Sequence, residues 1–180
     1  MDIPYKIIRS ARKTIAIQIV DGNVLVRCPN RMAAADIRRF VESKADWIEK
    51  HLSRAADRPK LPPLTVDEVR ALADRALKII PQRVAHFAPL VGVSYNGITI
   101  RNQRTRWGSC SSLGNLNFNC LLVLVPPAVL DYVVIHELCH RREMNHSAKF
   151  WAEVEKFDPD YREHRKWLKE NGGSLIGRLP

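Results

Sequence analysis

The chain has no apolar run that approaches the roughly 18 residues a membrane-spanning helix needs. Its first residues lack the apolar segment of a secretory signal peptide, so nothing in them indicates secretion. Its four cysteines form neither a C-x-x-C pair nor a short-range framework, a pattern typical of reduced thiols. These absences predict a cytoplasmic protein that has no contact with a membrane.

The composition is that of an ordinary globular protein. With 180 residues the chain can bury a proper core, and neither repeats nor low-complexity tracts interrupt it. The strongest break is the proline-containing stretch Arg58-Pro59-Lys60-Leu61-Pro62-Pro63. We therefore expect a single domain over residues 1–180, which would subdivide, if anywhere, near residues 58–64.

Acidic residues are in deficit: 29 Lys and Arg stand against 19 Asp and Glu, which gives a net charge of +10. Such an excess indicates contact with polyanions such as nucleic acid or nucleotides through a basic surface. Much of the positive charge is dispersed, as at Arg38-Arg39, Arg141-Arg142 and residues 162–169. Dispersed basic charge is more often a matter of solubility, so polyanion contact is one expected kind of partner among others.

The N-terminal part of the sequence predicts strands followed by helices. Residues 14–20 and 24–28 flank Asp21-Gly22, a strong hairpin signal. Apolar residues at helical spacing then predict a helix over residues 36–52. A second helix begins after Thr65, because Thr65 and Glu68 form a capping-box pattern.

The C-terminal part returns to strands and ends in helices. We expect a second hairpin from residues 91–95 and 98–101 around Asn96-Gly97, and strands near residues 106–107 and 116–125. Pro126-Pro127 suits the first turn of a helix, and further helices are expected from Ser147 to about Phe157 and on to about Gly173. The fold class predicted is α+β: N-terminal β-hairpins with a linking helix, then a helix that contains His136-Glu137-Leu138-Cys139-His140, then C-terminal helices.

The most informative motif is His136-Glu137-Leu138-Cys139-His140, which reads H-E-x-x-H. Four helical residues turn through about 400° and rise about 6 Å, so the two histidines lie on one face and can hold one metal ion. Glu137 is then close enough to hold a metal-activated water and take its proton. Two solvated histidines on a surface helix are the plain alternative. The apolar residues 129–135 argue against it, because buried histidines need a shared partner.

A third ligand is expected at His146, ten residues after His136, since catalytic zinc usually takes three protein ligands. The spacing is that of the metzincin pattern, but Glu143 stands where that pattern has glycine, so the metzincin assignment fails. Asn145 is expected to turn the chain instead, with Ser147 as the N-cap of the next helix. Glu153 or Glu155 is the rival third ligand.

Several segments together resemble the YgjP-like (DUF45) family of metallopeptidases over nearly the whole chain: residues 104–111, 114–119, 126–127, 136–140, 143–147 and 150–151. The resemblance implies a small zinc-metallopeptidase-like fold. It also implies that His136, His140 and His146 hold one zinc ion and that Glu137 is the general base. It does not supply a substrate.

Peptidases with such a helix commonly pair an extended substrate with the edge strand beside the metal, and residues 117–121 alternate in a way that suits such a strand. Five residues are candidates for lining the cleft: Arg104, Arg106, Trp107, Asn117 and Asn119. The function predicted is a zinc-dependent hydrolase, foremost a metallopeptidase that acts on a peptide or protein. The alternatives are a metal-dependent hydrolase of a phosphoanhydride such as a nucleoside triphosphate, and a basic nucleic-acid-binding module with a structural zinc. Glu137 weighs against the last, because a structural site has no use for a base.

Overall fold

The structure is a computed structural model that describes residues 3–20, 22–56 and 61–180. Contacts within the chain divide it into two compact units, Met1–Lys60 and Leu61–Pro180. The boundary falls in the proline-containing stretch, of which residues 58–60 lie outside the described residues. Each unit has a hydrophobic core of its own.

The first unit is a three-stranded sheet with two helices. Its strands are β1 (Tyr5–Ser10), β2 (Ala16–Val20) and β3 (Asn23–Pro29), in the order β1-β3-β2. The antiparallel pairing of β2 with β3 confirms the first hairpin, although Asp21 of its turn lies outside the described residues. β1 pairs with β3 in parallel. The core of this unit consists of Val24, Val26, Cys28, Ile37, Val41 and Ile48.

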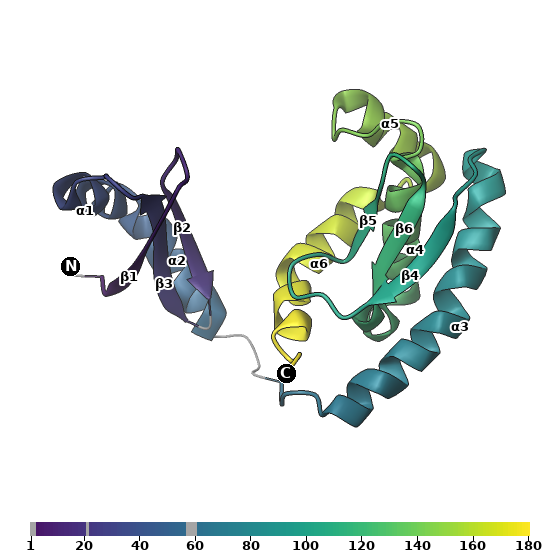
Figure 1. The fold of residues 1–180 in the computed structure, drawn as a ribbon, viewed down its shortest axis with the longest axis horizontal. Helices are drawn as coiled ribbons and strands as arrows, with labels where there is room; N and C mark the ends of the chain where they lie inside the picture. The colour runs from purple at the N-terminus through teal and green to yellow at the C-terminus, as the bar shows by residue number, and fades with distance from the viewer. Residues whose placement is uncertain (1–2, 21, 57–60) are drawn as a thin grey trace. The chain divides into compact units, whose positions relative to one another are not determined.

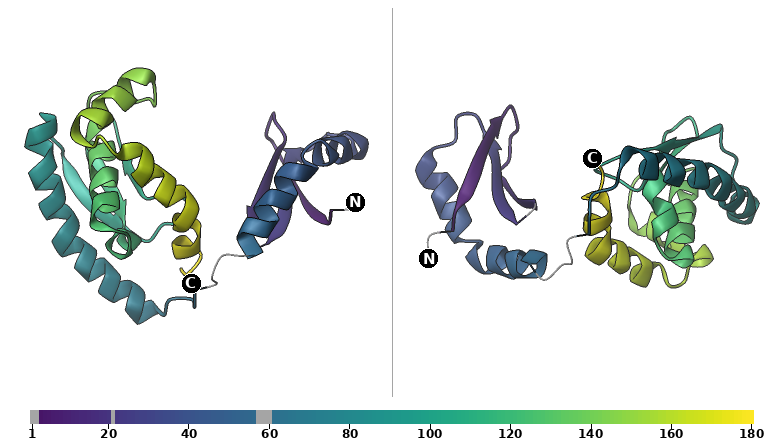
Figure 2. Two further views of the ribbon diagram at one scale, coloured as in Figure 1. Left: turned by 180° about the vertical axis from the view of Figure 1, so that it is seen from behind. Right: turned by 90° about the horizontal axis from the view of Figure 1, so that it is seen from below.

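The single helix predicted over residues 36–52 is wrong, because the chain forms α1 (Ala34–Glu42) and α2 (Ala45–Ala56) instead (Figures 1 and 2). The break comes at Ser43, whose hydroxyl donates a hydrogen bond to the carbonyl of Phe40 at 2.8 Å. Serine side chains that bond nearby backbone groups compete with helix continuation. The break still leaves Ile37, Val41 and Ile48 in one core.

The second unit contains the sheet β4-β6-β5, formed by β4 (Gly97–Arg101), β5 (Gly108–Cys110) and β6 (Asn115–Asn119). β6 is the central strand: it pairs with β4 in parallel and with β5 antiparallel. Its side chains Leu116 and Phe118 are fully buried against the helices. This arrangement leaves β5 as an edge strand.

The second hairpin predicted for residues 91–101 is wrong, although its second strand, residues 98–101, is confirmed as part of β4. The long helix α3 (Val66–Val91) runs through Val91, and Gly92 ends it in the left-handed conformation with φ +72°. The helix continues because Val84, Ala88 and Val91 extend its buried face. Its predicted start is confirmed: the Thr65 hydroxyl accepts from the Glu68 amide, and the Glu68 carboxylate accepts from the Thr65 amide at 2.7 Å.

The strand predicted over residues 116–125 is correct only as far as Asn119. A 3-10 helix, η1 (Cys120–Leu124), follows, and the Asn119 side chain caps it by accepting from the Leu121 amide at 3.1 Å. Its residues Cys120, Leu121 and Leu122 are almost completely buried. A short apolar run that is buried on all sides does not distinguish strand from helix.

Three helices complete the unit: α4 (Pro127–Cys139), α5 (Ala148–Phe157) and α6 (Tyr161–Ile176). α4 begins at the predicted proline pair and packs against α3, α5, α6 and β5 (Figure 1). A two-bond ion pair between Arg83 and Asp131, at 2.6 and 2.7 Å, ties α3 to α4. In the described residues no helix combines the length and the hydropathy that crossing a membrane requires.

Candidate metal centre

His136 lies in the last turn of α4, and His140 is the residue that caps the end of this helix. Their ring centroids lie 4.9 Å apart, and the ring planes are nearly perpendicular. Most of the rest of α4 is buried, so the core fixes the position of this turn. The two imidazoles therefore share one face of a rigid helix, as the motif predicted.

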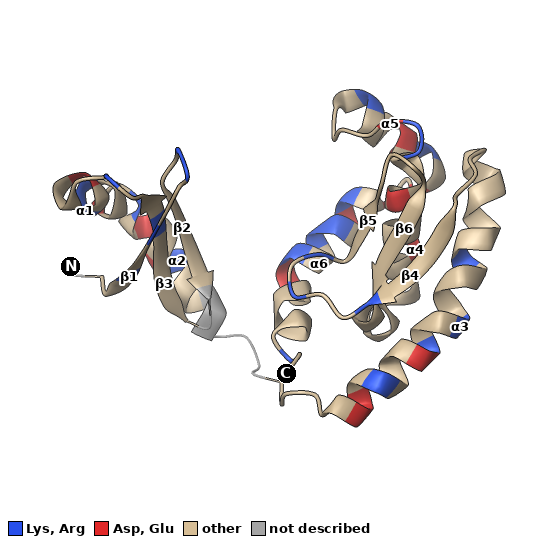
Figure 3. Cartoon of the chain, in the orientation of Figure 1, with Lys and Arg blue, Asp and Glu red and all other residues tan. Residues whose placement is uncertain are grey.

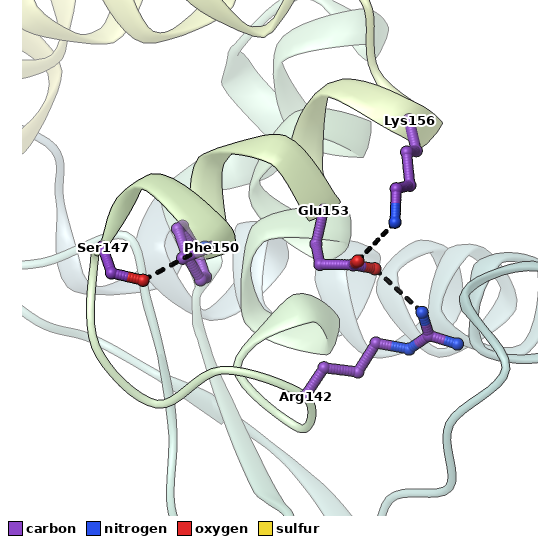
Figure 4. A network of polar contacts seen from close by, with 5 residues as sticks. All are labelled: Arg142, Ser147, Phe150, Glu153 and Lys156. Carbon is purple, nitrogen blue, oxygen red and sulfur yellow. Dashed lines mark hydrogen bonds and ion pairs between the residues drawn. The ribbon is translucent and has the colours of Figure 1, made fainter.

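His146 reaches the same place from the loop between α4 and α5. The Asn145 side-chain oxygen accepts from the Ser147 amide at 3.0 Å, which turns the chain, and the Ser147 hydroxyl accepts from the Phe150 amide at the start of α5 (Figure 4). The Nε2 atoms of His146 and His136 lie 3.0 Å apart. One nitrogen from each of the three histidines lies within 4.8 Å of the others. The structure thus brings together the three predicted ligands.

The rival carboxylates are engaged elsewhere. Glu153 accepts a hydrogen bond from Arg142 at 2.8 Å and pairs with Lys156 (Figure 4). Glu155 pairs with Arg162 at 2.7 Å. Within the described residues the group of His, Cys, Asp and Glu side chains that could hold a metal consists of the three histidines.

Burial keeps the helix-borne histidines in the form that binds metals. Burial first, and the neighbouring His140 and His146 in addition, lower the pKa of His136 to about 3. Burial also lowers the pKa of His140. The Nδ1 of His140 lies 3.1 Å from the Glu143 carbonyl, which selects the tautomer with hydrogen on Nδ1 and leaves the Nε2 lone pair free. Among the described residues no group bonds the buried Nδ1 of His136.

Glu137 lies beside the histidines with only 5% of its surface exposed. Burial raises its pKa to about 8, while the positive charge of Arg106 acts to lower it. Its Oε2 atom is buried and has no hydrogen-bond partner in the described part of the chain. A carboxylate is costly to bury in this way unless something positive faces it.

Strand β5 passes close over Glu137 because residue 108 is glycine. A Cβ atom at Gly108 would lie 2.6 Å from Oε1 of Glu137, closer than real contacts allow. The strand and the three histidines enclose an open pocket of about 320 Å³. Its lining residues are Arg106, Gly108, Ser109, Cys110, His136, Glu137, His140, Met144 and His146.

Of the five residues predicted to line the cleft, the structure brings Arg106 into the pocket and places the other four elsewhere. Arg104 donates to the carbonyls of Leu179 and Pro180. Trp107 packs against the core beside Gly172, and Asn117 donates to Ser109. Asn119 is buried and donates to the carbonyls of Gln103 and Arg106, at 2.6 and 3.1 Å.

The prediction that residues 117–121 form the substrate-facing edge is wrong, because β6 is paired on both sides. The edge strands of this sheet are β4 and β5, and β5 is the one that lines the pocket. Asn119 N–H bonds Trp107 O, and Ser111 N–H bonds Asn115 O, so by the alternation of antiparallel pairs the backbone groups of Gly108 and Cys110 point away from β6. Gly108, Ser109, Cys110 and Met144 were missed as pocket residues. The run of small residues after Trp107 was the signal that could have found the first three.

Comparison with known proteins places the chain among metallopeptidases. The YgjP-like, metallopeptidase domain family matches residues 13–70 and 69–171. The chain matches no curated protein. Among solved structures, the metallopeptidase zymogen of Pyrococcus abyssi abylysin is similar at 24% sequence identity with a TM-score of 0.46; the match covers 51% of this chain and 94% of that chain.

Proposed function

We propose, because the chain belongs to the YgjP-like metallopeptidase family, that it is a zinc-dependent peptidase in which His136, His140 and His146 hold one zinc ion and Glu137 is the general base. The observation that carries this proposal is the convergence of three histidine nitrogens beside a buried, unpaired carboxylate. No separate purpose is evident for such a carboxylate in a purely structural site. Hydrolysis explains both features together.

The donor set fits zinc. Imidazole nitrogen is a preferred ligand of this ion, and catalytic zinc sites keep three protein ligands with a fourth position open. The described residues that gather here supply three ligands and no fourth. A zinc ion held in this way would lower the pKa of a water molecule toward about 7 and polarise the scissile carbonyl.

Glu137 would move the proton. Its raised pKa of about 8 describes the metal-free protein, and a nearby positive ion would lower it, so the carboxylate would be ionised at neutral pH. It would then accept a proton from the attacking water and deliver it to the leaving amine. Gly108 matters to this step because only glycine lets β5 lie so close to the carboxylate.

The substrate would lie along β5. The outward-facing amides and carbonyls of Gly108 and Cys110 offer backbone partners to an extended peptide, directly above Glu137. This favours a peptide over a phosphoanhydride, which has no backbone to pair. Basic residues occur on several elements of the chain, among them α3 and α6 (Figure 3), so the net charge does not by itself identify a polyanion-binding surface.

The test is cleavage of a complex peptide mixture by the zinc-loaded protein, with new chain ends identified by mass spectrometry. We expect zinc-dependent cleavage by the wild type and a loss of at least about 100-fold in the Glu137→Gln variant, which should keep its zinc. Equal cleavage by the two proteins would exclude Glu137 as the base. Absence of new chain ends with the zinc-loaded wild type would contradict the peptidase function.

A further inference from the structure

The pocket contains one arginine whose charge no described partner neutralises. Arg106 is exposed, and no described side chain or carbonyl bonds its guanidinium. The neighbouring arginines are engaged: Arg104 with the last two carbonyls, Arg101 with Asn117, and Arg141 with the carbonyls of Ser94 and Ser112. Arg106 is thus available to a ligand.

The base of this side chain is held in place. Asn119, with 1% of its surface exposed, donates to the Arg106 carbonyl at 3.1 Å and accepts from the Leu121 amide. The next residue, Trp107, accepts from the Asn119 amide at 2.8 Å and packs against the core. A backbone that is already fixed at this position reduces the entropy lost when a ligand binds.

The position of Arg106 relates it to the scissile bond. It stands two residues before Gly108, where β5 begins, and it lines the same pocket as Glu137 and the three histidines. Its charge reaches Glu137, whose pKa it acts to lower. A peptide paired with β5 above Glu137 would therefore pass Arg106 within a residue or two of the bond that is cut.

The zinc-loaded site would carry a net positive charge, which favours binding of an anion. With zinc bound by neutral imidazoles, the two positive charges of the ion and one of Arg106 exceed the single negative charge of Glu137. A carboxylate complements this excess, and the planar guanidinium fork matches it with two parallel hydrogen bonds. The other residues that line the β5 side, Gly108, Ser109 and Cys110, are small and lend no competing charge.

We propose that Arg106 binds a substrate carboxylate next to the scissile bond, so that the enzyme selects acidic peptides. This inference rests on the proposed peptidase function. The carboxylate has two sources, an Asp or Glu side chain and the C-terminus of a short peptide. Both present the same group to the guanidinium at the end of the cleft where β5 begins.

The test uses two pairs of short peptide hydroxamates, in which the hydroxamate binds zinc and replaces the scissile bond. One pair differs by Glu against Gln, and the other by a free against an amidated C-terminus. Dissociation constants are measured by calorimetry on the zinc-loaded protein. In at least one pair we expect the acid to bind about tenfold more tightly than the amide at low salt, with a smaller difference at high salt.

The matched variants are Arg106→Gln and Arg75→Gln, since Arg75 is an exposed arginine on α3 without a described partner. The preference for the acid should vanish in Arg106→Gln and persist in Arg75→Gln. The pair that shows it identifies the source of the carboxylate.

Equal affinities within both pairs, or a preference that survives in Arg106→Gln, would overturn the inference and leave the zinc site intact. Failure of every hydroxamate to bind would overturn the open zinc site as well, and this inference with it. Displacement of the hydroxamates by ATP, lost in Arg106→Gln and without any acid preference, would assign Arg106 to phosphate and also overturn the proposal.

Discussion

The end of α4 and the loop that follows it bring histidines to one point by different means. His136 and His140 are carried by a helix that the core surrounds, and their spacing follows from helical periodicity alone. His146 is exposed and stands on a segment without regular structure. Its position depends on the Asn145 turn, the Ser147 cap and the aromatic rings of α5.

The ligands of this site therefore differ in how firmly the fold holds them. The helical ligands are fixed whenever the protein is folded, so they set the place of the metal. The loop ligand depends on a few local contacts, each of which one substitution can remove. We therefore expect metal affinity to be controlled largely from the loop and α5, and proton transfer from α4 and β5.

The largest effect should come from removing either a histidine carried by α4 or the histidine of the loop. His140→Ala and His146→Ala should each weaken zinc binding by more than about 100-fold, beyond the range for residues that only support ligands. The two variants should differ in their free energy of unfolding when no metal is bound. His140→Ala frees the Glu143 carbonyl and should cost about 1 kcal/mol of unfolding free energy, whereas His146→Ala should cost little. Chelator competition measures the zinc affinity, and urea unfolding measures the stability of the metal-free protein. A zinc affinity of His146→Ala equal to that of the wild type would refute a three-histidine site.

A smaller effect is expected from the support of the loop ligand. Trp151 stacks on His146 with ring centroids 5.6 Å apart and on Tyr161 at 5.3 Å. Trp151→Ala should lower zinc affinity about tenfold, and Trp151→Phe should recover most of it. The control is Trp47→Ala, which removes a half-exposed tryptophan of the first unit. If Trp151→Ala binds zinc as the wild type does, the loop holds His146 without help from α5.

The contact between β5 and α4 gives a third test. An Ala side chain at position 108 would collide with Glu137 and must displace its carboxylate. We expect Gly108→Ala to lower kcat/KM at least about tenfold while zinc affinity stays within about twofold. Gly97→Ala is the matched control, because its nearest contact is an ordinary 3.9 Å. A parallel loss of zinc would show that the damage is not confined to Glu137.

The last test concerns the stability of the metal-free protein rather than metal affinity or catalysis. Since burial raises the pKa of Glu137 to about 8, the unfolded chain releases this proton earlier as pH rises, so the wild type loses stability between about pH 4.5 and 8. Glu137→Gln should escape this loss, and its stability relative to wild type should rise by about 3 kcal/mol from pH 5 to pH 8, because each unit of pKa shift corresponds to about 1.4 kcal/mol. The lowered pKa of His136 destabilises both proteins below about pH 6.5 and cancels in the difference. Thermal unfolding in chelator measures it, and a constant difference would mean that Glu137 is ionised in the folded apoprotein.

Features of the site that depend on neighbouring residues could be predicted from the sequence. The H-E-x-x-H helix, its start at Pro126-Pro127 and the Ser147 cap each rest on a few consecutive residues. The position of His146 beside His136 was also predicted, because the spacing leaves room for only a short turn.

Features of the site that depend on strand order could not be predicted from the sequence. The sequence pattern does not show that β4 pairs with β6 rather than with residues 91–95, since that pairing joins residues 18 apart through their register. Strand order also decides which edge is free. It places Asn117 and Asn119 on the central strand and gives Gly108 and Cys110 the edge beside Glu137. Arg106, predicted to line the cleft, stands next to the β5 edge and lines the pocket.

Metal content, measured by mass spectrometry on wild type and His146→Ala purified without added metal, is the decisive test of a three-histidine zinc site. We expect close to one zinc per chain in the wild type, most of it lost from the variant, and full retention in Glu137→Gln. A wild type that binds no metal even when zinc is offered would contradict the hydrolase function. Full zinc in His146→Ala would remove the loop ligand and with it the distinction between helix and loop.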